Sequence, residues 1–192
     1  MIKRYIYITT IFLFTFLSCK SQNVIILESL NRELTKIINK DNDINKLNKD
    51  HIEVREKALS DIIEHRKEFF SKVNLKKTAF KLIETSRFNK SYIGIILADD
   101  NDVFVFSIKR EKSVFKQTNF DDYSTSNPND INLYIFKNLN EDKLDELINL
   151  SKKAKNHHGE TFIVTTSENG EVASNIINTF FIQDNQGKLI YW

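Results

Sequence analysis

The residues able to do chemistry in this chain are few, and the four histidines come first because imidazole binds metals and transfers protons near neutral pH. His51 and His65 are fourteen residues apart, which on one continuous helix places them on the same face but about 21 Å apart. They therefore cannot share a metal ion. His157 and His158 precede Gly159 at the expected end of a helix, where capping or solvation is favoured over ligation or catalysis.

Acidic residues form groups that a divalent cation could use. The segment DNDINKLNKDHIE begins like a calcium loop, but Lys46 stands where the turn glycine is needed and Ile52 where the bidentate glutamate is needed. Asp99, Asp100 and Asp102 lie in a predicted turn, where carboxylates usually form the turn and face water. The sequence gives no second group of potential ligands that the fold must bring next to these three aspartates. We therefore predict no metal site and no cofactor.

Catalytic motifs are absent from the sequence. It contains no G-x-S-x-G elbow, no H-E-x-x-H pair, no Walker loop and no G-x-G-x-x-G turn. We predict no catalytic residue, and an enzyme is not favoured. A hydrolase with an acidic site that forms only in the folded chain stays an alternative, because paired carboxylates are brought together by the fold.

Cys19, the only cysteine, directly follows an apolar N-terminal segment. Lys3 and Arg4 precede an apolar run that extends to Leu17, and the small residue Ser18 stands just before the cysteine. These are the parts of a secretory signal. The apolar run 6–17 has twelve residues, against the roughly 20 that a membrane-spanning helix needs, so a cleaved signal is preferred to a transmembrane anchor.

The stretch Phe16-Leu17-Ser18-Cys19 resembles the lipobox of bacterial lipoproteins. The resemblance implies that Cys19 receives a diacylglycerol on sulfur, is exposed by a type II signal peptidase and is then acylated on its new amino group. It also implies a protein of the cell envelope, and Lys20 in the next position favours the outer membrane, facing the periplasm. The alternative for Cys19 is an ordinary secreted thiol left after cleavage, without a disulfide partner in the chain.

Processing at this point divides the chain into a signal peptide (1–18), a lipidated cysteine with a short tether (19–23) and a single domain (24–192). Removal of the signal takes away Lys3 and Arg4, so that 26 basic residues remain against 26 acidic ones and the formal charge is zero. A neutral chain has no net positive field to attract nucleic acid. The partners we expect are the lipid bilayer, through Cys19, and one envelope or toxin protein.

The spacing of apolar residues predicts helices over about 24–88. The residues that recur at steps of three and four in the first of them are Leu27, Leu30, Leu34, Ile37 and Ile38. A second run follows from Ile44 to Phe70, and a third is predicted in LKKTAFKLIETSRF. Glycine and proline, which would interrupt long helices, are absent from 23–93.

A mixed, mainly antiparallel sheet is predicted for about 91–192. YIGIILA and VFVFSI are β-branched and aromatic runs on either side of DDND, which indicates a hairpin at 99–102. Their nearly continuous apolar character suggests strands covered on both faces. NLYIF, a crossover helix at about 140–155 and TFIVTTS would form a parallel βαβ unit. The predicted class is therefore α+β.

The polar stretch 116–130 is the predicted contact surface. Its candidate partner-binding residues are Phe115, Phe120, Asp121, Asp122 and Tyr123. Surface loops with aromatic and polar side chains often carry binding. The alternative is a disordered connection whose aromatic side chains fold back on the core.

The function that these observations favour is a membrane-anchored cell-envelope lipoprotein with a non-catalytic binding role, such as a periplasmic inhibitor or immunity protein. An envelope scaffold that binds through apolar surface left on its N-terminal helices is the first alternative. The hydrolase named above is the second. The sequence does not identify a partner.

Overall fold

The computed structural model describes residues 24–40, 49–75, 77, 79–87, 91–153, 161–178, 181–183 and 189–191. The predicted signal peptide, Cys19, His157 and His158 lie outside these ranges, as does most of the rejected calcium loop. The described part of the chain opens with an N-terminal helix (described over 24–40) and α2 (Lys49–Lys72), which are followed by four strands in succession. These are β1 (Phe80–Arg87), β2 (Ser91–Ala98), β3 (Asp102–Lys109) and β4 (Lys112–Asn119).

Three helices connect β4 to the last strands: α3 (Phe120–Ser126), α4 (Ile131–Asn140) and α5 (Leu144–Lys153). The strands β5 (Thr161–Glu168) and β6 (Glu171–Asn178) complete a six-stranded sheet with the order β4-β3-β2-β1-β5-β6. The short strands β7 (Phe181–Gln183) and β8 (Leu189–Tyr191) form a separate pair. The α+β class is thus confirmed.

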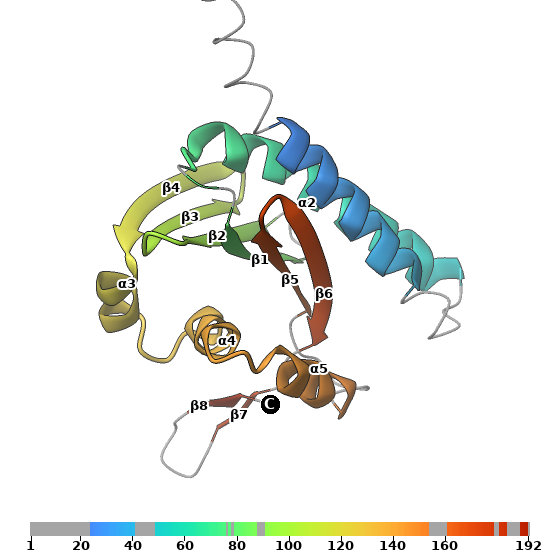
Figure 1. Ribbon diagram of the computed structural model, residues 1–192. Helices are drawn as coiled ribbons and strands as arrows, with labels where there is room; N and C mark the ends of the chain where they lie inside the picture. Colours follow the sequence, from blue (N-terminus) through green and yellow to red (C-terminus); the bar gives the residue numbers. More distant parts are fainter. Residues whose placement is uncertain are drawn as a thin grey trace, which may run out of the picture.

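Helices cover both faces of the sheet (Figure 1). The N-terminal helix and α2 lie side by side over one face, and α3, α4 and α5 lie on the other. Alternate residues of each strand therefore face different cores: in β1, Leu82 joins the cluster under the N-terminal helices and Ile83 joins the cluster under α4 and α5. This explains the continuous apolar sequence of β2, whose residues from Gly94 to Ala98 are all buried.

Tight turns join the antiparallel strands. Asn101 turns the predicted hairpin between β2 and β3 with a φ of 62°, so that hairpin is confirmed. Arg110 and Glu111 form the two-residue turn into β4, and Asn169 and Gly170 form the one between β5 and β6, all with positive φ. Such turns match the right-handed twist of the paired strands.

The prediction of helix up to about residue 88 is wrong for its last part. The N-terminal helices end at Lys72, and residues 80–87 form β1, a central strand. β1 pairs with β2 on one side and with β5 on the other. The spacing of Leu82 and Ile83 is compatible with a helix or with a strand. Hydrogen bonding to both β2 and β5 stabilises the strand.

The predicted strand NLYIF is also wrong, because this segment lies in α4. The Asp130 carboxylate caps the helix, accepting a hydrogen bond from the backbone N–H of Asn132 at 2.9 Å. Leu133, Phe136 and Leu139 then pack into the second core. Capping and packing override the strand preference of the β-branched and aromatic residues.

The predicted parallel βαβ unit is therefore also wrong, because NLYIF was to be its first strand. The sheet is antiparallel at every pairing in the described residues, and β5 lies antiparallel to β1. The crossover helix predicted at about 140–155 is present as α5, but it belongs to a three-helix connection that leads from the edge strand β4 to β5.

Candidate functional site

The segment predicted as a polar loop, 116–130, is mostly regular structure: it comprises the end of β4, the helix α3 and the turn before α4. Phe115 is half-buried and stacks near Phe104, with ring centroids 6.4 Å apart. Phe120 is half-buried against the second core. Asp121 and Asp122 are exposed in the first turn of α3.

Tyr123 lies inside the protein instead of on its surface. Its hydroxyl donates a hydrogen bond to the Asp130 carboxylate at 2.7 Å. Burial and the neighbouring Asp130 carboxylate raise the pKa of Tyr123 well above its ordinary value. Of the five predicted contact residues, only the two aspartates therefore present most of their side chains to solvent.

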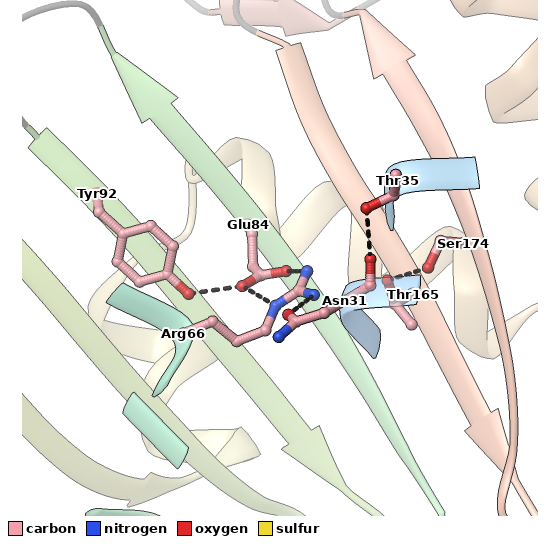
Figure 2. Close-up of polar contacts among 7 residues, drawn as sticks. All are labelled: Asn31, Thr35, Arg66, Glu84, Tyr92, Thr165 and Ser174. Carbon is pink, nitrogen blue, oxygen red and sulfur yellow. Dashed lines mark hydrogen bonds and ion pairs between the residues drawn. The ribbon is translucent and has the colours of Figure 1, made fainter. Parts of the chain in front are cut away.

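A polar network lies buried between the N-terminal helices and the sheet (Figure 2). The Glu84 carboxylate accepts hydrogen bonds from Arg66 Nε at 2.9 Å and from the Tyr92 hydroxyl at 2.7 Å, and its second oxygen pairs with Arg66 Nη2. Arg66 Nη1 donates to Asn31 Oδ1 at 3.0 Å. Arg66 and Glu84 are both 0% exposed. The network joins two helices to two strands.

Arg66 and Glu84 stabilise each other's charged forms in this network. Burial opposes the charge of Arg66, but attraction to Glu84 and the hydrogen bonds between them outweigh it and raise the pKa of Arg66. Burial, first, and the Glu84 carboxylate raise the pKa of Tyr92 well above its ordinary value. Tyr92 therefore stays protonated and donates to Glu84. Because every partner is satisfied internally, this network is a structural device and not an open reaction site.

Sequence reasoning did not find this network, although a signal for it exists. Arg66 falls on the apolar stripe of α2, four residues after Ile62 and three before Phe69. Glu84 occupies the same face of β1 as Phe80 and Leu82. Two opposite charges, each at a position that the pattern assigns to the core, predict a buried ion pair.

A cleft lies at one end of the sheet, where β1 begins and β2 and β5 end. Phe80 pairs there with Ala98 on one side and with Ser167 on the other. The cleft has a volume of about 250 Å³. Its polar lining residues are Lys81, Asp99, Asn101, Asn140, Thr166, Ser167 and Glu168.

Lys81 connects this cleft to the helices below the sheet. Its amino group donates a hydrogen bond to the side-chain oxygen of Asn140, the last residue of α4. Asp99 and Glu168 are exposed on opposite sides of the opening, at the ends of β2 and β5. An ammonium, an amide and two carboxylates can hold a polar group of a ligand by hydrogen bonds and charge.

The helix α3, which carries the two exposed aspartates, begins next to the turn after β2. The backbone N–H of Phe120, which precedes Asp121, donates to the carbonyl of Asn101 at 2.9 Å. Asn119 then caps α3, accepting from the N–H of Asp122 at 2.8 Å. Asn101 lines the cleft, so the start of α3 is bonded to a lining residue, whereas Asp121 and Asp122 themselves do not line the cleft.

A second, shallower groove of about 540 Å³ runs between α2 and the turn after β3. It contains His65, whose ring centroid is 5.5 Å from that of Tyr92. Glu64, Glu68 and Glu111 also line it, but within the described residues no group of three potential ligands is placed to hold a metal ion. The groove therefore has no evident chemistry.

Known proteins give no guide to the function of this chain. No protein-family model, curated protein or solved structure matches this chain. Among the residues that the structure describes, no helix has the length and apolar character needed to cross a membrane.

Proposed function

We propose that this chain is a lipid-anchored protein of the bacterial cell envelope with a non-catalytic binding role, and that a periplasmic inhibitor or immunity protein is the form of that role to test first. The anchor is Cys19, and the first described helix begins at residue 24, five residues beyond it. Two or three acyl chains at one residue supply enough buried CH₂ groups for stable attachment.

The observation that carries the binding role is the cleft at the Asp99 end of the sheet. It is formed by turns and helix ends, which is where rigid scaffolds commonly present binding groups. Asp99 and Glu168 give its rim two exposed carboxylates. A partner with basic side chains complements such a rim, and charge complementarity of this kind speeds association and selects the partner.

The scaffold alternative depended on apolar surface left along the N-terminal helices. Of the apolar residues on these helices, Leu30, Leu34, Ile62 and Phe69 are buried against the sheet and are not available to a partner. No particular observation favours the hydrolase. The anchored binding protein is therefore the proposal that we carry forward.

The anchor makes the first prediction. Cys19→Ala is expected to move nearly all of the protein from the membrane fraction to the soluble fraction, since no acyl chain can be attached. Incorporation of an alkyne analogue of palmitate should disappear in the same variant. Fractionation and in-gel detection of the analogue measure both effects.

Ser21→Ala is the matched control, because it changes a small polar residue two positions away and leaves the thiol in place. It should keep both the membrane location and the label. If Cys19→Ala stays with the membrane to the same extent as the parent protein, lipid attachment at this cysteine is refuted.

The cleft makes the second prediction. The protein fixed on beads should retain a basic protein from envelope extract, and Asp99→Asn with Glu168→Gln should reduce retention by about tenfold or more, because rim charges set the association rate. Raising the salt concentration should release the same partner, since exposed charges are screened. Quantitative mass spectrometry of the eluates measures the loss.

Glu111→Gln is the control for charge alone, because Glu111 is an exposed acid in the turn at the other end of the sheet. It should leave retention unchanged. A partner that is retained equally by all three proteins would show that the cleft is not the binding surface. Extracts that yield no partner at all would count against the binding role itself.

A further inference from the structure

Two large apolar side chains at the start of the N-terminal helix have no place in either core. Val24 is 52% exposed and Ile25 is 61% exposed, and neither belongs to the two clusters of buried residues. The buried stripe of this helix starts only at Ile26 and continues through Leu30 and Leu34. Val24 and Ile25 therefore serve no packing role within the described protein.

Exposure of this kind is uncommon in the described residues. Among the residues whose side-chain burial the structure describes, only one other large apolar side chain is exposed, Val114 on the edge strand β4. A single exposed apolar residue needs no explanation. Val24 and Ile25 are a different case, because they are adjacent and lie close to the proposed lipid. Their exposed apolar areas add together, and the membrane surface is near enough to cover them.

The length of chain between Cys19 and this pair identifies the surface. Four residues, 20–23, lie between Cys19 and Val24, and the five residue steps from one to the other span at most about 17 Å. The lipid on Cys19 would sit in the outer part of a bilayer leaflet, so the tether confines the start of the helix to the membrane–water interface. Apolar side chains held there gain by leaving water for the boundary between headgroups and acyl chains.

We propose that Val24 and Ile25 insert into the same lipid leaflet that holds the acyl chains of Cys19, as a second membrane contact beside the anchor. This inference rests on the proposed lipid anchor. With two separate contacts, the lipid and the helix start, the protein is held in a preferred orientation on the membrane. A lipid alone, on a short tether, would leave it free to rotate.

The single cysteine of the chain makes a direct test possible. In the full-length protein with Ile25→Cys, processing and acylation consume Cys19 and leave one free thiol for a polarity-sensitive fluorophore. The lipidated protein is placed in vesicles of phosphatidylethanolamine and phosphatidylglycerol. We expect the emission of the fluorophore to shift to shorter wavelength. Lipids with brominated acyl chains should quench this emission, and aqueous iodide should quench it little.

Lys36→Cys is the matched control, because Lys36 is exposed on the same helix, twelve residues and about 18 Å beyond Val24. Its label should keep the emission and the iodide quenching of the detergent-solubilised protein. A label at position 25 that behaves like the one at position 36 would overturn the inference. So would disulfide cross-linking of position 25 between two copies, which would assign the pair to a dimer contact.

Failure of the anchor is recognised separately. Mass spectrometry of the purified Ile25→Cys protein shows whether Cys19 carries acyl chains, and an unacylated protein would label at two thiols instead of one. In that case the proposed anchor is wrong. If Cys19 is acylated and position 25 stays in water, the anchor stands and the second membrane contact does not exist.

Discussion

Glu84→Gln is expected to lower the free energy of unfolding by about 3–5 kcal/mol, and Arg66→Met by a similar amount. Each change leaves the other member of a fully buried ion pair without its partner, and both side chains are 0% exposed. The remaining group must stay buried without compensation or open the core to water. Urea-induced unfolding, followed by circular dichroism, measures the loss.

The double variant Arg66→Met with Glu84→Leu is the informative companion. It removes both charges and fills the space with apolar groups, so its loss should be much smaller than the sum of the two single losses. Tyr92→Phe removes only the hydroxyl that donates to Glu84, and about 1–2 kcal/mol is expected for it.

An exposed ion pair provides the control for charge removal. Lys36 lies 3.4 Å from Glu33 on the N-terminal helix, and its side chain is 71% exposed. Lys36→Ala should change the free energy of unfolding by no more than about 0.5 kcal/mol. If Glu84→Gln proves as mild as Lys36→Ala, the network does not hold the helices to the sheet.

Gly94→Ala is expected to destabilise the protein by about 3 kcal/mol, although it adds a single methyl group. Gly94 pairs with Glu84 across the β1–β2 ladder. A Cβ atom at Gly94 would lie 2.5 Å from the Tyr92 hydroxyl oxygen and 2.9 Å from the ring of Phe69. The Tyr92 side chain passes over this glycine to reach Glu84, so the methyl group displaces it from its hydrogen bond.

The same change in a Tyr92→Phe background separates the two contacts. Without the hydroxyl the shorter contact is gone, so Gly94→Ala should cost less there than in the parent protein. Gly170→Ala is the control, because Gly170 has a φ of +84° and no atom within 4 Å of the added Cβ. It should cost about 1 kcal/mol, from backbone conformation alone. Equal losses for the two glycines would contradict the steric explanation.

Local patterns were sufficient for several elements and misleading for others. The spacing of Leu30 and Leu34 predicts the N-terminal helix, and the acidic turn after β2 predicts its hairpin with β3. The segment that became β1 had a spacing compatible with helix, and the segment that became α4 had residues typical of strands. In both cases, long-range pairing or packing outweighs a local preference of a few tenths of a kcal/mol per residue.

The candidate site divides in the same way. Asp121 and Asp122 were identifiable as exposed acids, but the cleft that brings Lys81, Asp99 and Glu168 together depends on the order of strands that are far apart in the sequence. Phe115 and Tyr123 were predicted as contact residues because their segment mixes aromatic and polar residues. Exposed binding loops and segments at the border of a core share this mixture. Packing against Phe104 leaves Phe115 half-buried, and the hydrogen bond to Asp130 holds Tyr123 inside the protein.

By itself the sequence determined the α+β class and the lack of known catalytic motifs, and it predicts an N-terminal signal that ends at Cys19. Each of these depends on residues that are close in the chain or on simple counts. The tertiary structure alone decided the order of the strands, the burial of Arg66 against Glu84 and the cleft at the Asp99 end of the sheet. These depend on contacts between segments far apart in the chain, whose pairing is selected by the packing of the whole core.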